Sequence, residues 1–175
     1  MKHIVLLGDS IFDNAAYVNG APDVISHLHS LLPGDWQATL LAVDGSVTTD
    51  VITQISKIPA SVTHLIVGAG DNDGLSRADI LQRPAGSVGA ALDELASLRA
   101  EFCQNYRRML RALLALKQPL ALCTVYDPRS PDALMQRLTT TALNILARGW
   151  YKITMRPLNG IGRPFNMGTA ILMLN

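Results

Sequence analysis

The sequence contains little charge, and neither sign is in excess. Its 175 residues include 15 lysines and arginines against 14 aspartates and glutamates, which gives a formal net charge of +1. Such a balanced chain has no whole-protein field that would attract nucleic acid or an anionic membrane surface. We therefore expect no nucleic-acid partner, and we look for function in a local site.

Cysteines and long apolar runs are also scarce. The two cysteines, Cys103 and Cys123, lack the spacing of metal ligands, so we expect buried free thiols. No segment is long enough to cross a bilayer, and the apolar stretch after Met1 is too short for a signal peptide. These absences predict a cytoplasmic protein without membrane insertion, and the residues imply no metal and no other cofactor.

About half of the residues are hydrophobic, which is enough for one domain with one core. Strand patterns alternate with helix patterns four times, and this predicts an α/β fold with a parallel sheet, right-handed crossovers and helices on both faces. The predicted strands are 4–7, 36–43, 63–69 and 120–125, and the predicted helices are 22–32, 49–58, 87–117 and 131–147. Residues 70–86 are predicted as a loop, and Thr48 or Thr49 as the cap of the second helix. No repeat or linker divides the chain, so residues 1–175 are predicted to form a single domain.

The last part of the chain lacks acidic residues. No Asp or Glu follows Asp132, although average usage would place roughly five there. From residue 149 the hydrophobic periodicity also fades. Residues 149–175 therefore form an atypical tail, in which 151–155 is predicted as a fifth strand and 170–174 as a short apolar end. Two interpretations stay open: a truncated chain or altered reading frame near Asn144, or an ordinary basic tail.

Polar turns follow the first three predicted strands. They are Gly8-Asp9-Ser10, Asp44-Gly45-Ser46 and Gly70-Asp71-Asn72-Asp73. The carboxyl ends of parallel strands meet at one edge of the sheet, where open α/β sheets bind ligands, so we expect these turns to converge. Ser10 is a candidate nucleophile, accompanied by three neutral donors: the amides of Ser10 and Gly45 and the side chain of Asn72. Acyl transfer needs such donors because its tetrahedral intermediate carries an oxyanion.

The same residues resemble the sequence blocks of the SGNH (GDSL-type) hydrolases. Residues 8–14, GDSIFDN, are similar to the first block, Gly45 matches the glycine block, and residues 70–73, GDND, match the G-x-N-D block. The resemblance covers the first two-thirds of the chain. It implies a flavodoxin-like three-layer α/β/α sandwich with four to five parallel strands. It also implies that Ser10 is the nucleophile and that Ser10, Gly45 and Asn72 form the oxyanion hole.

One block of that family is not found. In the family, a D-x-x-H motif near the C-terminus supplies a histidine as general base, whereas the histidines of this chain are His3, His27, His29 and His64. The first and last lie near strand starts, which puts them at the wrong end of the predicted sheet, and the other two lie on the first predicted helix. Without a base, a serine hydroxyl is a poor nucleophile at neutral pH.

Three explanations for the missing base stay open. The base lies in a truncated or misread C-terminus, a carboxylate such as Asp9, Asp13 or Asp73 assists, or the chain is a non-catalytic relative. Asp9 and Asp73, with Tyr126 after the fourth strand, are also expected to contact the substrate. A calcium loop at 71–74 and a phosphate cradle at 8–10 are weaker interpretations, because the first lacks a closing carboxylate and the second a P-loop lysine.

Together these residues predict a hydrolase of carboxylic esters or other acylated small molecules. In this hypothesis Ser10 attacks the acyl carbonyl, the oxyanion hole holds the intermediate, and the partner is a small acyl ester. The alternative is a catalytically impaired or inactive SGNH-like binding protein without the histidine base.

Overall fold

A five-stranded sheet forms the centre of the protein, in a computed structural model that describes residues 1–123, 132–134, 136–138, 140–141 and 171–174. The strands, in the spatial order β2-β1-β3-β4-β5, are β1 (Lys2–Gly8), β2 (Trp36–Leu40), β3 (His64–Gly68), β4 (Leu120–Cys123) and β5 (Ile171–Leu174). The first four run parallel, as predicted. The fifth pairs antiparallel with β4, so the predicted apolar end at 170–174 contains a strand of the opposite direction.

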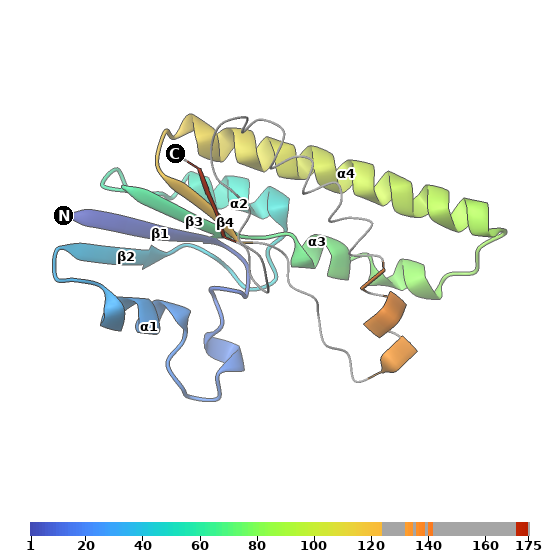
Figure 1. The fold of residues 1–175 in the computed structure, drawn as a ribbon, viewed down its shortest axis with the longest axis horizontal. Helices are drawn as coiled ribbons and strands as arrows, with labels where there is room; N and C mark the ends of the chain where they lie inside the picture. The colour runs from blue at the N-terminus through green and yellow to red at the C-terminus, as the bar shows by residue number, and fades with distance from the viewer. Residues whose placement is uncertain (124–131, 135, 139, 142–170, 175) are drawn as a thin grey trace.

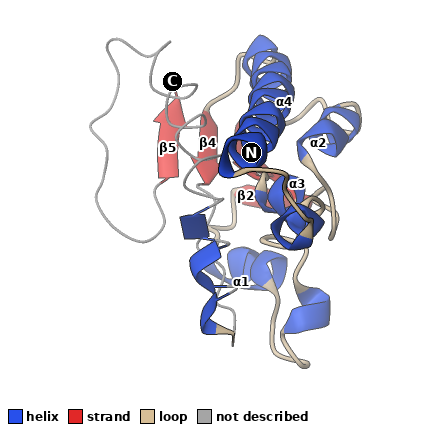
Figure 2. Ribbon diagram, turned by 90° about the vertical axis from the view of Figure 1, so that its right-hand side faces the viewer, coloured by secondary structure: helices blue, strands red, loops and turns tan. Residues whose placement is uncertain are grey.

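Helices cover both faces of this sheet, which confirms the three-layer prediction. They are α1 (Val24–Leu31), α2 (Thr48–Ile55), α3 (Asp71–Leu75) and α4 (Val88–Ala115), with short 3-10 turns η1 (Ala15–Tyr17) and η2 (Ala78–Gln82). Helix α1 lies on one side of the sheet, and α2 and the long α4 lie on the other (Figure 1). In Figure 2, which is turned by 90° from that view, α4 lies in the upper part of the picture and α1 in the lower part, with β2 between them.

The apolar run in β1 is buried on both faces. Val5 and Leu7 belong to the larger core cluster beneath α2 and α4, whereas Ile4 and Leu6 belong to the cluster beneath α1. This alternation follows from the two-residue period of a strand. It explains why the run is continuous, as in strands covered by helices on both sides.

Three predictions about these elements were wrong. Residues 70–86 were predicted as loop, yet they contain α3 and η2. Helix α2 ends at Ile55 rather than near Ile58, and no threonine at its start acts as the N-cap residue. The missing threonine cap has a tertiary cause, because the amide and the hydroxyl of Thr48, in the first turn of α2, bond to the carboxylate of Asp73 on α3.

Several predictions concern residues outside the described part. Tyr126, the predicted strand 151–155 and almost all of the tail 149–175 are among them. Within the predicted helix 131–147, residues 133–134, 136–138 and 140–141 are helical. In the part of the chain that the structure describes, no helix is both long and apolar enough to span a membrane.

Candidate active site

The turn after β1 requires glycine at position 8. Gly8 has φ of +130°, and a Cβ atom built there would lie 1.7 Å from the carbonyl oxygen of Gly68 on β3. The two glycines face each other as the last pair of the β1–β3 register, and the Asp9 amide donates a 3.1 Å hydrogen bond to Gly68. The two chains therefore approach closely just before the candidate nucleophile.

Asp9 is the centre around which this turn folds. Its carbonyl accepts hydrogen bonds from the amides of Phe12 and Asp13, and its Oδ1 accepts one from the amide of Ile11 at 3.0 Å. Asp9 is 1% exposed, whereas Ser10 is half-buried, and the Ser10 side chain makes no hydrogen bond with any described residue. The turn thus buries the aspartate and leaves the serine partly exposed. Substrate contact by Asp9 stays a prediction, and its burial favours a structural role.

The turn after β2 is tied to the turn after β1. Val43 donates its amide to the Gly8 carbonyl at 3.1 Å, and the Asp44 amide donates to Asp13 Oδ2 at 2.9 Å. The Tyr17 hydroxyl donates to Asp44 Oδ2 at 2.8 Å. Gly45, which follows, is exposed, has φ of +78° and has open space around it. Its backbone is therefore free to approach a ligand.

Asn72 joins the third turn to the second. Its Nδ2 donates a 3.0 Å hydrogen bond to the carbonyl oxygen of Ser46, the neighbour of Gly45. The three polar turns therefore lie together at the carboxyl edge of the parallel strands, as predicted. Asn72 is half-buried.

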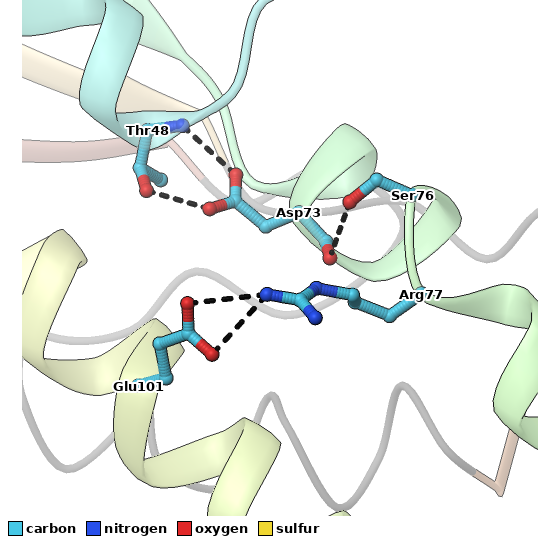
Figure 3. Close-up of polar contacts among 5 residues, drawn as sticks. All are labelled: Thr48, Asp73, Ser76, Arg77 and Glu101. Atoms are coloured by element: carbon cyan, nitrogen blue, oxygen red, sulfur yellow. Dashed lines mark hydrogen bonds and ion pairs between the residues drawn. The ribbon is translucent and has the colours of Figure 1, made fainter.

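Asp73 attaches α3 to the start of α2 (Figure 3). Its Oδ2 accepts the Thr48 amide at 2.9 Å, and its Oδ1 accepts the Thr48 hydroxyl at 2.7 Å. Thr48 is fully buried. This geometry favours a structural role, and the predictions of a base or substrate contact at Asp73 stay untested. The exposed ion pair between Arg77 and Glu101 at 3.3 Å adds a contact to α4, and exposed pairs of this kind contribute little.

All three predicted oxyanion donors have an unused N–H group among the described residues. The backbone amides of Ser10 and Gly45 donate to no described residue. The Asn72 amide has two hydrogens, of which one goes to Ser46 and the other has no described acceptor. Three neutral N–H donors of these turns therefore have no acceptor among the described residues.

The carboxyl groups at this edge are held in a poorly hydrated environment. Burial, followed by repulsion from Asp9 and Asp73, raises the pKa of Asp71 from 3.8 to about 7. Burial also raises the pKa of Asp9 and of Asp73. Asp9 Oδ2 is buried without a hydrogen-bond partner, which favours the protonated acid. Among the described residues, no three His, Cys, Asp or Glu side chains are grouped to hold a metal ion.

Asp71→Asn is expected to raise the free energy of unfolding at pH 8 by about 1–2 kcal/mol, after discounting for solvent screening of a half-buried group. The folded pKa of Asp71 is raised from 3.8 to about 7, so between these values the folded state keeps a proton that the unfolded state has lost. Stability therefore falls as pH rises through this window, and above it the wild type carries the full penalty. Urea unfolding should show the gain at pH 8 and almost none at pH 4. An equal gain at both values would contradict this electrostatic assignment.

The four histidines of the chain are all described, and none lies in the three turns. His3 bonds through its ring to Ser61 and Thr39, each at 2.8 Å, and His64 stacks on Trp36 with ring centroids 5.1 Å apart. Both occupy the amino-terminal halves of their strands, so their predicted place at the opposite end of the sheet is confirmed. The two remaining histidines lie on α1, outside the turns.

Gln54 is a residue of this site that the sequence did not reveal. It lies on α2, is 3% exposed, and hydrogen-bonds both the amide and the carbonyl of Gly8 at 2.8 Å. The available signal was a polar residue three positions after the buried Val51, on the apolar face of the predicted helix. That pattern alone does not say which backbone group the side chain meets.

Comparison with known proteins gives matches among solved structures only. No protein-family model matches the chain, and no curated protein matches it. The extracellular lipase from Streptomyces rimosus is similar in structure with a TM-score of 0.58 and 15% identity, over 89% of this chain and 77% of the lipase. Phospholipase A1 from Streptomyces albidoflavus matches with a TM-score of 0.60 and 14% identity, over 89% of this chain and 76% of that enzyme.

A third solved structure carries the family name suggested by the sequence blocks. AlinE4, an SGNH-hydrolase family esterase, matches with a TM-score of 0.51 and 20% identity, over 94% of this chain and 86% of that one. At identities this low, the structural similarity shows a common fold, and the activity has to be tested by experiment. This chain therefore has the fold of SGNH-hydrolase family esterases and lipases.

Proposed function

We propose that this protein is an SGNH-type serine hydrolase that cleaves carboxylic esters or other acylated small molecules. The observation that carries the proposal is the convergence of the three polar turns. A half-buried serine, whose hydroxyl makes no hydrogen bond with a described residue, and three unused N–H donors belong to the turns that meet at one edge of a sheet. The shared fold with esterases and lipases supports the same reaction class.

In the proposed reaction, Ser10 Oγ attacks the acyl carbonyl carbon and the carbonyl oxygen becomes an oxyanion. The amides of Ser10 and Gly45 and the Asn72 side chain donate hydrogen bonds to that oxygen. Collapse of the tetrahedral intermediate releases the alcohol and leaves an acyl group on Ser10. Water then attacks this ester, and a second tetrahedral intermediate releases the acid and restores the serine.

The proposed reaction assigns none of the four histidines of this sequence as the base, because all four lie outside the turns. The serine proton passes to water or to a carboxylate of this edge, and the reaction is correspondingly slow. Triad enzymes that lack one member still exceed the uncatalysed rate by roughly 10³–10⁴-fold through the oxyanion hole and binding. We expect a rate of that order for this protein with a small activated ester.

Hydrolysis of a short-chain p-nitrophenyl ester, combined with labelling by a fluorophosphonate, tests the proposal. The protein should release p-nitrophenol faster than buffer alone, and peptide mass spectrometry should place the phosphonate on Ser10. Heat-denatured protein serves as the control, since its serine has no assembled oxyanion hole. Equal rates with native and denatured protein, together with no label on Ser10, would overturn the proposal.

The second candidate is a binding protein with the same fold and no turnover. The position of the histidines favours it, because His3 and His64 are engaged at the far end of the sheet. This candidate predicts that a short acyl ligand protects the polar turns from hydrogen exchange while Ser10 stays unlabelled by the fluorophosphonate. Labelling of Ser10 would exclude it.

A further inference from the structure

We infer that Gln54, acting through Ser46, is a positioning residue that holds the three turns of the candidate site at fixed distances from one another. The catalytic part of this inference rests on the proposed function. Gln54 touches none of the proposed reacting atoms, and its side chain contacts backbone two residues before Ser10 and a hydroxyl next to Gly45.

The carboxamide of Gln54 is used almost completely. Its Oε1 accepts the Gly8 amide at 2.8 Å, its Nε2 donates to the Gly8 carbonyl at 2.8 Å, and the same Nε2 donates to Ser46 Oγ at 3.3 Å. An amide side chain has two donor hydrogens and one acceptor oxygen. Gln54 therefore pairs with Gly8 as a peptide group of a neighbouring strand would.

The Gly8 amide needs a side chain as its hydrogen-bond partner, because β2 ends before it reaches Gly8. The paired register of β1 and β2 stops at Leu6 opposite Leu40, so the Gly8 amide lies beyond the last residue of the neighbouring strand. A buried amide without a partner is costly, and α2 packs over this end of β1 (Figure 1). Gln54 supplies the missing partner and thereby ties the Ser10 turn to α2.

Ser46 extends this connection to the other two turns. Its hydroxyl accepts from Gln54, and its carbonyl accepts the Asn72 side chain at 3.0 Å. Its amide donates to the Val43 carbonyl at 3.1 Å, which closes the loop around Gly45. A continuous path of hydrogen bonds therefore runs from Gly8 through Gln54 and Ser46 to Asn72, the side chain proposed as an oxyanion donor.

A purely structural role for Gln54 makes a different prediction. Any buried glutamine with hydrogen-bond partners stabilises the fold around it. If this were its only role, its loss would lower the free energy of unfolding and leave the positions of the three turns relative to one another unchanged. Positioning instead predicts that a change at Gln54 is felt at Gly45 and Asn72, which it does not touch. The variant is Gln54→Met, which has similar length and cannot make these bonds, and Ser46→Ala is the second variant because it removes only the 3.3 Å bond.

Val51→Ala is the matched control for lost stability. Val51 is fully buried on the same helix, three residues before Gln54, and packs in the larger core cluster. Its side chain has no polar atom and therefore takes no part in the hydrogen bonds between the turns. In ¹⁵N-labelled full-length protein, Gln54→Met should speed hydrogen exchange of the Gly8 amide and shift the resonances of the Gly45 amide and the Asn72 side chain. Ser46→Ala should shift the last two. Changes confined to Gly8 and α2, or the same shifts in Val51→Ala, would overturn the inference.

Kinetics supply the second measurement. Displacing groups that must be held in place lowers kcat more than KM, and we expect a loss of about 10- to 100-fold in kcat for Gln54→Met. Val51→Ala should keep kcat and KM while unfolding more easily. Unchanged kcat in Gln54→Met would overturn the catalytic positioning. A wild type without any esterase activity would instead count against the proposed function, and the resonance shifts would still decide whether Gln54 couples the turns.

Discussion

Ser10→Ala is expected to lose all covalent labelling by a fluorophosphonate and to hydrolyse a short p-nitrophenyl ester more slowly than the wild type, down to the residual rate that an oxyanion hole and substrate binding supply without the nucleophile. The reason is that the proposed acyl-enzyme forms on the Ser10 hydroxyl, and alanine provides no atom to carry the acyl group. The hydroxyl makes no hydrogen bond within the described residues, so its removal should leave stability almost unchanged.

Ser56→Ala is the matched control for this substitution. Ser56 lies at the far end of α2, is exposed, and donates its hydroxyl to the Thr53 carbonyl at 2.7 Å. It should retain wild-type hydrolysis and labelling. Ester hydrolysis by Ser10→Ala at the wild-type rate, with both proteins folded, would remove Ser10 from the reaction.

Gly8→Ala should be the most destabilising single substitution proposed here, with a loss of at least about 3 kcal/mol in the free energy of unfolding. Two costs combine at this position. The backbone has φ of +130°, which disfavours any residue with a Cβ atom, and that atom would lie 1.7 Å from the Gly68 carbonyl oxygen. Relief requires β1 and β3 to separate just where the Ser10 turn begins, so activity should fall as well.

Gly20→Ala separates these two costs. Gly20 also has positive φ, at +85°, but no atom lies within 4 Å of the added Cβ. Its substitution should cost only about 1 kcal/mol, the conformational part alone. Urea unfolding of both variants measures the difference. Equal free energies of unfolding for Gly8→Ala and Gly20→Ala would show that β1 and β3 separate at little cost to make room for the added Cβ atom.

These substitutions probe turns that the sequence located well. The unbroken apolar run at 4–7 and the glycines and small polar residues after it are local signals, and they predicted a buried central strand ending in a ligand-binding turn. The positions of the turns at 44–46 and 70–73 followed from the same logic applied to the next two strands. Such predictions succeed because parallel strands with right-handed crossovers leave few possible arrangements.

Other features of the site were decided by contacts between residues distant in sequence. The segment at 71–75 contains Gly74 and two nearby aspartates, which favour a turn, yet it forms α3 with Asp73 bonded to Thr48. The raised pKa of Asp71 likewise depends on burial and on Asp9, some sixty residues away. No local pattern contains either fact.

By itself, the sequence determined the α/β class, the parallel direction of the first four strands and the sheet edge at which the three polar turns lie together, because hydrophobic periodicity and turn residues act over a few neighbouring positions. Only the tertiary structure decided that Asp9 is buried while Ser10 is half-buried, that Asp73 caps α2, and that Gln54 replaces a missing strand partner. The physical reason is that hydrogen bonding and desolvation of a polar side chain depend on what surrounds it in space, and the partners of these side chains come from other parts of the chain.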